Sequence, residues 1–332
     1  MKDFTTIAID TAKNTFYVVG FDEAGKIVGR RKFTRSGLKN WIVKQQILMI
    51  YMEACGGSHE WGRLFSQWGH EVKLIAPQFV IPFRQGEKND WNDAIAIGIA
   101  GHQPTMRFVG IKTQEQQSVQ ALHRVRSRVQ RDRVSLSNQL RGFLYEFGFI
   151  APKSISSLKN KAYELLDEKE LPVLMTDLVR DLLSELLTLE KRLKKYDLKI
   201  QQMVRSDPMA SRLMEMPGIG PITASALVSD IADARVFRNG RQLSAYLGLV
   251  PRQFSTGGKQ RLGGITKRGD RYLRQLLIHG ARSVIRCLGD KQDRTSRWLR
   301  QLIERRGVNK ATVALANKQA RWVWAKMVAA QA

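Results

Sequence analysis

Apolar runs and short polar segments alternate through the first part of the chain. Residues 5–34, TTIAIDTAKNTFYVVGFDEAGKIVGRRKFT, place β-branched and aromatic residues in runs separated by turn residues, and DEAG is typical of a hairpin turn. This pattern predicts three strands joined by turns. The elements predicted after them are an amphipathic stretch at 38–46, a strand at 47–54, a helix at 61–68, a strand at 71–77 and a helix that starts near residue 90. Strands that alternate with helices after an opening meander predict an α/β domain with a mixed sheet at residues 1–113.

Helical periodicity replaces this alternation from about residue 114. In the segment 171–204, leucines recur at spacings of three and four residues, which is typical of a long amphipathic helix that packs against a second one: Leu182, Leu186, Leu189 and Leu193. The polar segment APKSISSLKN at 151–160 predicts a break before this helix. We therefore expect residues 114–205 to form a helical arm with the character of an antiparallel coiled coil.

The last region, residues 206–332, is predicted to be mainly α-helical. The segment 216–231, MPGIGPITASALVSDI, has the form of a helix-hairpin-helix, in which glycines allow close approach and exposed amides hold a phosphate. A glycine-rich turn between two packed helices explains the same residues equally well. A Gly-rich basic loop, FSTGGKQRLGGITKRGD, then leads into a basic amphipathic helix, and a closing helix is predicted to pack through Trp322 and Trp324.

Positive charge dominates the composition. The chain carries 55 Lys and Arg against 30 Asp and Glu, a net charge of +25, and residues 251–310 alone hold 16 basic against 4 acidic residues. An excess of this size indicates a polyanionic partner, either nucleic acid or an acidic membrane surface. The sequence has no apolar run long enough to span a bilayer and no signal-peptide pattern, and Cys55 and Cys287 lack disulfide or zinc spacing. We therefore predict a cytoplasmic protein that binds nucleic acid and no membrane.

Four acidic residues stand at predicted strand ends and at one helix start. Asp10 ends the run IAI, Glu53 ends ILMIYM, and Asp90 and Asp93 open the helix of KNDWNDA. Taken alone, Asp90 is explained as a helix N-cap and Asp93 by the helix dipole. Taken together, these positions can converge on one edge of the sheet, where four carboxylates repel one another unless cations are present. Hard oxygen ligands and a phosphate substrate favour Mg²⁺, and two such ions can hold both sides of a phosphodiester.

These motifs resemble those of a known family. The order AIDTAK, MEACG and KNDWNDA is similar to the RuvC-like domain, with an RNase H fold, of DEDD insertion-sequence transposases. The later MPGIGPITASAL and YLGLVPRQFSTGGKQRLGGITKRGDRYLRQLLIHGA are similar to their C-terminal transposase domain. The family is called IS one-ten, and STGGK…LGGITKRGD most resembles its eleven-eleven subgroup. The resemblance implies that Mg²⁺, for which Mn²⁺ can substitute, binds a carboxylate tetrad made of Asp10, Glu53, Asp90 and Asp93. Glu60, in SHEWGR, is expected to be a helical surface residue.

The resemblance also implies a catalytic serine in the STGG loop. Ser255 is the candidate, and Thr256 beside it is the alternative. A serine hydroxyl that attacks a DNA phosphodiester forms a covalent linkage and keeps the bond energy for rejoining. Without the resemblance, Ser255 is better explained as a plain turn residue. The basic residues expected to bind phosphates nearby are Arg252, Lys259, Arg261, Lys267, Arg268 and Arg271.

Partners follow from the same resemblance. Family members recombine double-stranded donor and target DNA under the direction of a small noncoding guide RNA, in a bacterial cytoplasm at the nucleoid. A protein that relies on such pairing recognises the shape and backbone of nucleic acids more than base edges. The family acts as a homo-oligomer, a dimer or a tetramer, and the leucines along residues 171–203 are a plausible assembly surface.

Two other functions fit part of the pattern. A metal-dependent nuclease of the Holliday-junction type would use water at the same tetrad, and a covalent protein–DNA intermediate distinguishes it from a serine recombinase. A non-catalytic nucleic-acid-binding protein needs only the charge, but it leaves the four spaced acids unexplained. Metal-dependent DNA cleavage separates it from the other two.

Overall fold

The computed structural model describes residues 4–87 and 89–331, so Lys88 of the KNDWNDA motif lies outside the described residues. Within them the chain forms two compact units. The first contains residues up to 117 together with 230–242, and the second contains residues 118–229 together with those from 243 onward. The described residues include no helix that is both long and apolar enough to cross a bilayer.

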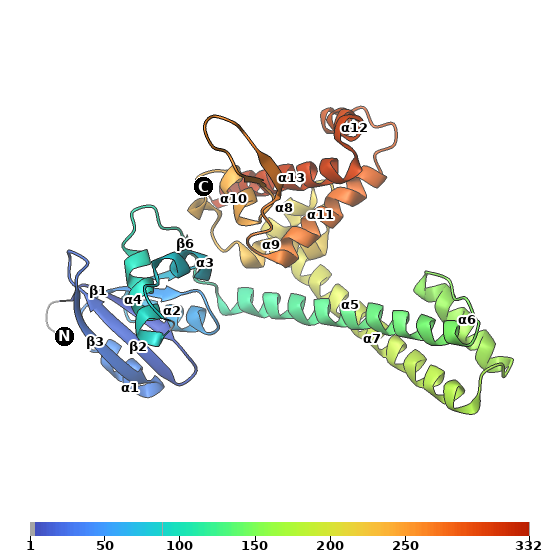
Figure 1. The fold of residues 1–332 in the computed structure, drawn as a ribbon, viewed down its shortest axis with the longest axis horizontal. Coiled ribbons are helices and arrows are strands. Elements are labelled where there is room, and N and C mark those ends of the chain that lie inside the picture. Colours follow the sequence, from blue (N-terminus) through green and yellow to red (C-terminus); the bar gives the residue numbers. More distant parts are fainter. Residues whose placement is uncertain (1–3, 88, 332) are drawn as a thin grey trace. The chain divides into compact units, whose positions relative to one another are not determined.

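The first unit is built on a six-stranded mixed sheet (Figure 1). Its strands lie in the order β3-β2-β1-β4-β5-β6, in which β1 pairs antiparallel with β2 and parallel with β4. The strands β2–β3 and β5–β6 are antiparallel and β4–β5 parallel. The bounds are β1 Thr6–Thr11, β2 Thr15–Phe21, β3 Ile27–Thr34, β4 Met49–Glu53, β5 Glu71–Ile75 and β6 Phe108–Val109. The predicted α/β domain with an opening meander and a mixed sheet is confirmed.

Helices cover both faces of this sheet. Because successive side chains of a strand point to opposite faces, Ile7 and Ile9 join one apolar core with α1 and α2, while Ala8 joins a second core with α4. The helices are α1 (Arg35–Ile42), α2 (Ser58–Gln67) and α4 (Asp90–Gly101), with the short α3 (Pro77–Val80) and 3-10 helix η1 (Ile81–Phe83) before α4. The later segment of this unit holds η2 (Ala234–Val236) and the start of α10 (Gly240–Tyr246), and Lys112 Nζ pairs with Asp230 Oδ1 at 2.7 Å.

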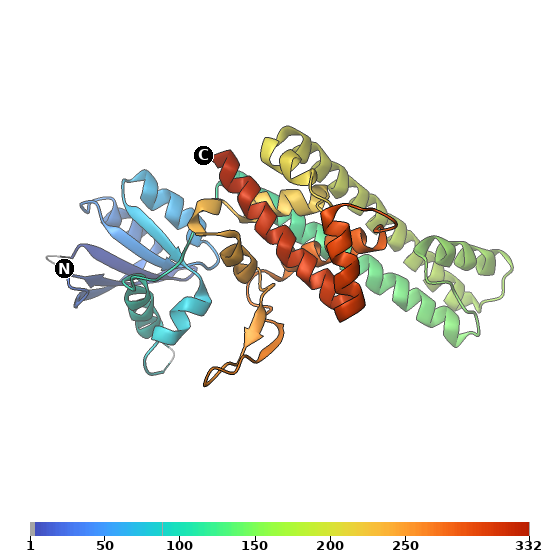
Figure 2. The same ribbon diagram turned by 90° about the horizontal axis from the view of Figure 1, so that it is seen from above.

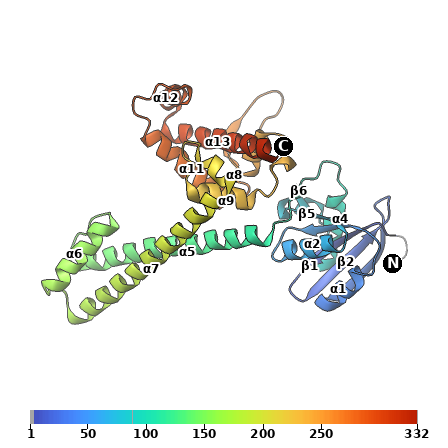
Figure 3. The same cartoon turned by 180° about the vertical axis from the view of Figure 1, so that it is seen from behind.

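Long helices open the second unit. The helices α5 (Gln114–Glu146) and α7 (Val173–Ser206) run in opposite directions and cross, with α6 (Ile155–Asp167) at the end where the chain turns back (Figure 3). Near the turn, Leu140 of α5 shares a core with Val179 of α7. Farther along, Arg126 of α5 pairs with Asp197 of α7. The predicted packing of two long helices is present, and its coiled-coil character stays a prediction.

The predicted break at 151–160 is wrong in part, because α6 begins inside it. Ser154 is the N-cap of α6 and its side chain accepts a hydrogen bond from the Ser157 amide at 3.0 Å. The serines that suggested a loop therefore serve the start of a helix. The apolar positions Leu158, Ala162 and Leu165 lie on one buried face and pack against the ends of α5 and α7.

The rest of the second unit is mainly α-helical, as predicted. It contains α8 (Pro208–Met214), α9 (Pro221–Asp230), α11 (Arg271–Arg286), α12 (Arg294–Arg306) and α13 (Val308–Gln331), and a two-stranded sheet of β7 (Pro251–Gln253) and β8 (Leu262–Ile265). The predicted closing helix is α13. Its buried side chains include Leu315, Val323 and Met327, whereas Trp322 and Trp324 are half-buried, so the two tryptophans supply only part of its packing.

The PGIG turn joins α8 to α9 and is pressed against α11. Gly218 has φ of +84°, which favours glycine, and a Cβ placed on Gly280 of α11 would lie 2.0 Å from the Gly218 carbonyl oxygen. Two glycines thus allow two backbones to touch. For Gly218 the explanation as a turn between packed helices is the better one.

The close contact between Gly218 and Gly280 can be tested with the same substitution, glycine to alanine, at two helical sites. Gly142 of α5 is exposed and a Cβ there would meet nothing within 4 Å. We expect Gly142→Ala to stabilise the protein by about 1 kcal/mol, because alanine is the better helix former. We expect Gly280→Ala to destabilise it by about 1–3 kcal/mol, because backbone faces the new methyl group and must move. Unfolding followed by circular dichroism measures both, and equal stabilisation by the two substitutions would contradict the close approach at Gly218.

Candidate catalytic site

The sheet places Asp10 and Glu53 side by side. The strands β1 and β4 are parallel and pair with Ile9 opposite Met52, so Asp10 and Glu53 are the next residues in register, at the carboxyl ends of the two strands. Both side chains are half-buried. Parallel pairing, which the sequence could not specify, is what puts these two acids at one edge.

The other two acids of the tetrad lie in the first turn of α4. The N-cap of this helix is Asn89, whose Oδ1 accepts a hydrogen bond from the Asn92 amide at 2.9 Å. Asp90 therefore does not cap the helix, and the ordinary explanation for it does not hold. Asp90 is exposed and Asp93 is half-buried.

Asp10 lies close enough to the other three carboxylates for their charges to affect its titration. Burial and repulsion by the three other carboxylates of the tetrad raise the pKa of Asp10 from an ordinary 3.8 to about 6, with burial the largest cause and Asp93 the next. A hydrogen bond from the Thr11 backbone opposes the shift. Negative charge concentrated in this way on hard oxygen donors is the environment that a divalent cation relieves.

The tetrad fits a divalent metal in charge and in donor type. Among the described residues, however, no three His, Cys, Asp or Glu side chains are arranged as a formed metal site. A neighbouring cation holds one member instead, because Arg84 Nη1 lies 3.4 Å from Asp93 Oδ1. Arg84 escaped sequence reasoning, since it stands alone after a short 3-10 helix with no motif around it.

A thiol and a hydroxyl border the same strand ends. Thr11 Oγ1 and Cys55 Sγ are 3.0 Å apart. Burial raises the pKa of the Cys55 thiol, and the charges of Glu53 and Asp10 add to this effect. The Cys55 thiol therefore favours its protonated form at neutral pH.

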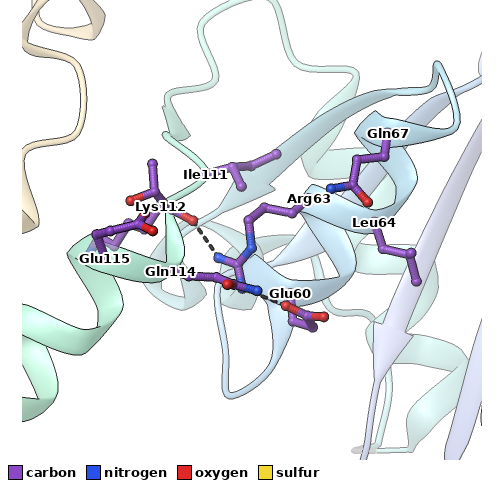
Figure 4. Close-up of a pocket in the computed structure, with 9 residues that line it drawn as sticks. Glu60, Arg63, Leu64, Gln67, Ile111, Lys112, Gln114 and Glu115 are labelled. Carbon is purple, nitrogen blue, oxygen red and sulfur yellow. Dashed lines mark hydrogen bonds and ion pairs between the residues drawn. The ribbon is translucent and has the colours of Figure 1, made fainter.

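Glu60 takes no part in this cluster. It lies in the first turn of α2 and pairs with Arg63 at 2.6 Å, at the rim of a hollow walled by α2 and residues 111–115 (Figure 4). Arg63 also donates to the carbonyl oxygen of Lys112 at 2.5 Å and to Gln117 Oε1 at 2.7 Å. These polar groups bind one another, so the hollow is a feature of the packing between α2 and the start of α5. Glu60 is a surface residue of a helix, as expected.

Ser255 lies on a hairpin of the second unit, which we call the serine hairpin (residues 251–265). This hairpin projects from the helices around it in Figure 2. At its tip, Gly257 and Gly258 both have positive φ, and the Lys259 amide donates to the Thr256 carbonyl at 3.1 Å, as in a tight two-residue turn. Ser255 is exposed, and its Oγ accepts hydrogen bonds from Gln253 Nε2 at 3.0 Å and from the Arg261 amide at 3.3 Å. Within the described residues, no carboxylate or histidine is hydrogen-bonded to it.

The base of the serine hairpin is held by a buried arginine. Arg274 of α11 is 8% exposed and its Nη1 donates to the carbonyl oxygens of Leu247 and Arg268, each at 3.1 Å. Two chain segments meet there so closely that a Cβ on Gly269 would lie 1.8 Å from the Tyr246 carbonyl oxygen. Sequence reasoning missed Arg274, because it looked like one more cation of a basic helix. The structure shows that it joins backbone segments.

The six basic residues expected to bind phosphates are all exposed on or beside the serine hairpin. Lys267 has φ of +55°, an uncommon conformation for a side chain of its kind, and its amide donates to the Gly248 carbonyl at 3.2 Å. In the part of the chain that the structure describes, none of the six forms an ion pair: Arg252, Lys259, Arg261, Lys267, Arg268 and Arg271. Their charges are available to a polyanion.

Known proteins match both ends of the chain. Residues 7–149 match a family model named for DEDD transposases of IS110 and described as a transposase, and residues 210–299 match the model of the transposase IS116/IS110/IS902 family. A probable family 20 transposase of Pseudomonas aeruginosa is 48% identical over 326 residues, which cover 97% of this chain and 96% of the relative.

Two named insertion elements supply further relatives. The transposase for insertion sequence element IS1111A of Coxiella burnetii is 39% identical, over 98% of this chain and 90% of the relative. The transposase for insertion sequence element IS1328 of Yersinia enterocolitica is 40% identical, over 98% of this chain and 97% of the relative. With full-length relatives at this identity and the four acids gathered at one sheet edge, the chain belongs to the IS110 (IS one-ten) family of DEDD transposases and is a DNA transposase.

Proposed function

We propose that this transposase cuts and rejoins DNA strands through Ser255, with Mg²⁺ held by the carboxylate tetrad and with a noncoding RNA as its guide. The observation that carries the proposal is the charge cluster at the sheet edge, where three neighbouring carboxylates and burial raise the pKa of Asp10 to about 6. A protein with net charge +25 gains nothing for DNA binding from four gathered acids unless a metal neutralises them. The cluster therefore favours metal-dependent catalysis over nucleic-acid binding alone.

The sheet topology supports an RNase H/RuvC-like identity for the first unit. Three antiparallel strands are followed by two parallel ones in the order β3-β2-β1-β4-β5, and the acids stand at the carboxyl ends of the central parallel pair β1 and β4. Ligands of open α/β sheets lie at these ends of the strands. Asp10, Glu53, Asp90 and Asp93 are the residues that would hold Mg²⁺, or Mn²⁺ in its place. When bound, the metal supplies charge neutralisation at the phosphoryl group.

Ser255 is the proposed nucleophile. Its oxygen forms a bond to the DNA phosphorus, the bond from phosphorus to one deoxyribose oxygen breaks, and that oxygen leaves as a hydroxyl after taking a proton. Gln253 and Arg261 each donate an N–H group to Ser255 Oγ. These hydrogen bonds stabilise the negative charge that develops on the oxygen as it loses its own proton. Thr256 has a different position, because its backbone pairs with Lys259 at the turn.

The exposed cations of the serine hairpin are proposed to hold DNA and RNA phosphates. They include Arg252 on β7, Lys267 just after β8 and Arg271 at the start of α11. Contacts of this kind bind independently of sequence and leave target choice to base pairing with the guide RNA. Donor and target DNA, the guide RNA and further copies of the chain, as a dimer or tetramer, are the proposed partners at the bacterial nucleoid.

Removal of any one tetrad carboxylate should stop recombination. We expect Asp10→Ala, Glu53→Ala, Asp90→Ala and Asp93→Ala each to lower strand exchange by at least about a hundredfold, because metal charge stabilisation is worth several kcal/mol. Glu60→Ala is the matched control, since Glu60 pairs with Arg63 on the surface of α2. Strand exchange with Mg²⁺, guide RNA and DNA measures the effect, and a loss in Glu60→Ala together with full activity in Glu53→Ala would show that the second ligand is misassigned.

Asp10 should lower stability at neutral pH when no metal is present. Its pKa is about 6 in the folded protein and ordinarily 3.8, so its contribution to stability is full below pH 4 and is lost as the pH rises through 6. At pH 8 with a chelator, we expect Asp10→Asn to stabilise the protein by about 1 kcal/mol, a value reduced for the partial exposure of the carboxyl. The gain should vanish at pH 4, and Mg²⁺ should stabilise the parent more than the variant. Thermal unfolding is the measurement, and destabilisation at pH 8 would rule out repulsion at this edge.

The serine decides between a recombinase and a nuclease that uses water. With guide RNA, Mg²⁺ and end-labelled DNA, we expect label to migrate with denatured parent protein and none to do so with Ser255→Ala. Binding of DNA and RNA should survive the substitution, because one exposed hydroxyl contributes little beside the surrounding cations.

Two outcomes of this experiment would revise the mechanism. An adduct that persists in Ser255→Ala and disappears in Thr256→Ala moves the nucleophile by one residue. Efficient cleavage with no adduct in the parent refutes the serine mechanism and supports hydrolysis by a metal-activated water.

A further inference from the structure

A groove of about 930 Å³ lies in the second unit between the serine hairpin and the helices α12 and α13. We call it the hairpin groove. Much of its wall is apolar and comes from Leu262 and Ile265 of β8 and from Val313 of α13. The indole of Trp298 of α12 also faces it. Leu262 is 57% exposed and so adds accessible apolar surface to this wall.

Three cations line the hairpin groove and no acid does. They are Lys310, Lys318 and Arg321, which recur along one side of α13. Within the described residues none of the three forms an ion pair. Positive charge collected beside apolar wall, with no acid to balance it, is complementary to a polyanion that also carries flat apolar groups.

Lys318 shows how positive charge is held beside the groove. Its ammonium lies 4.4 Å from the centre of the Trp298 ring and 5.1 Å from that of Trp322. Burial lowers the pKa of Lys318, and the neighbouring charges of Arg294 and Arg321 lower it further. The two indoles thus stabilise a cation that its other neighbours repel.

The occupant suggested by these features is an unpaired DNA strand. A base has a face for the apolar wall and Trp298, and its flanking phosphates suit the cations. The bases of a paired duplex are stacked inside it, so their faces cannot contact the apolar wall. DNA is favoured over RNA because β8 belongs both to the groove wall and to the hairpin that carries Ser255, the residue proposed to attack DNA. Leu262 of the wall lies opposite Gln253 in register, and Gln253 Nε2 donates a hydrogen bond to Ser255 Oγ.

We propose that the hairpin groove binds the unpaired segment of the DNA strand next to the phosphodiester that Ser255 attacks, with a base against Trp298 and phosphates at Lys310, Lys318 and Arg321. The site rests on the proposed function, since it names where the strand lies when the serine attacks. It assigns these four residues to DNA positioning and not to catalysis.

The test is equilibrium binding of short labelled oligonucleotides in Ser255→Ala protein, without metal or guide RNA, so that no chemistry takes place. The variant Lys310→Gln/Arg321→Gln removes two exposed charges from the groove. We expect it to bind single-stranded DNA about tenfold more weakly and to lose about 1.4 from the slope of log affinity against log salt, as two lost phosphate contacts on a single strand require. Duplex DNA binding should change by less than about twofold.

Matched controls separate the groove from charge in general. Arg286 is exposed near the end of α11 and does not line the groove, so Arg286→Gln should leave single-strand affinity within about twofold. Trp298→Leu should weaken single-strand binding at least about fivefold with an unchanged salt slope, because stacking releases no counterions. A 5-iodouracil base in the strand should crosslink under light to the peptide that contains Trp298. Circular dichroism of each variant checks the fold, and the glutamine variants test the proposal even if Trp298→Leu misfolds.

Three results would overturn the proposal. The first is single-strand binding by the double variant that equals that of Arg286→Gln. The second is a loss confined to RNA of the same sequence, which would make RNA the occupant. The third is an equal loss for duplex DNA, which would make the groove a general phosphate surface. A missing serine–DNA adduct would refute the serine mechanism but leave this binding assay unchanged, so the two failures are distinguishable.

Discussion

Repulsion between carboxylates at the ends of β1 and β4 is the constraint on which the first unit depends. Parallel pairing of these strands sets Asp10 beside Glu53, and the apolar face of α4 packs its acidic first turn over the same sheet. The burial of the apolar face of α4 stabilises the fold. The same packing brings the carboxylates of its first turn close to Asp10 and Glu53. A divalent cation bound at this edge would relieve a repulsion that the fold already overcomes.

The second unit presents Ser255, the nucleophile that we propose, on an exposed hairpin. A two-stranded hairpin is marginal in isolation. Here its base is joined to the helices by Arg274, which donates to carbonyls on both sides of the hairpin, and by glycines that let the two segments touch. The tip turns through Gly257 and Gly258, which both have positive φ. An anchored base suits the role that we propose for Ser255, because it gives an exposed hydroxyl a defined direction.

Sequence periodicity predicted the strands of the sheet and the long helices well, because alternation and leucine spacing are local properties. It failed where a residue's role depends on a distant partner. The serines before Leu158 were predicted to form a loop. They belong to the start of α6, which is stabilised by packing against apolar residues of α5 and α7. Asp90 looked like a cap, and Asn89 one position earlier takes that role. Arg274 and Lys318 are two cations of a basic region whose different environments, backbone carbonyls for one and indole rings for the other, no sequence pattern distinguishes.

Two opposite excesses of charge remain in the protein by itself. Burial and the charges of the other three acids raise the pKa of Asp10, while burial and the charges of Arg294 and Arg321 lower that of Lys318. Each excess opposes the fold of its own unit, and among the acids the ion pair of Arg84 with Asp93 offsets part of the repulsion. In the function that we propose, a divalent cation would neutralise the acids and DNA phosphates would neutralise the cations. Binding of metal and binding of DNA would then each stabilise the unit to which the ligand binds, because each ligand relieves a repulsion that the fold of that unit has to overcome.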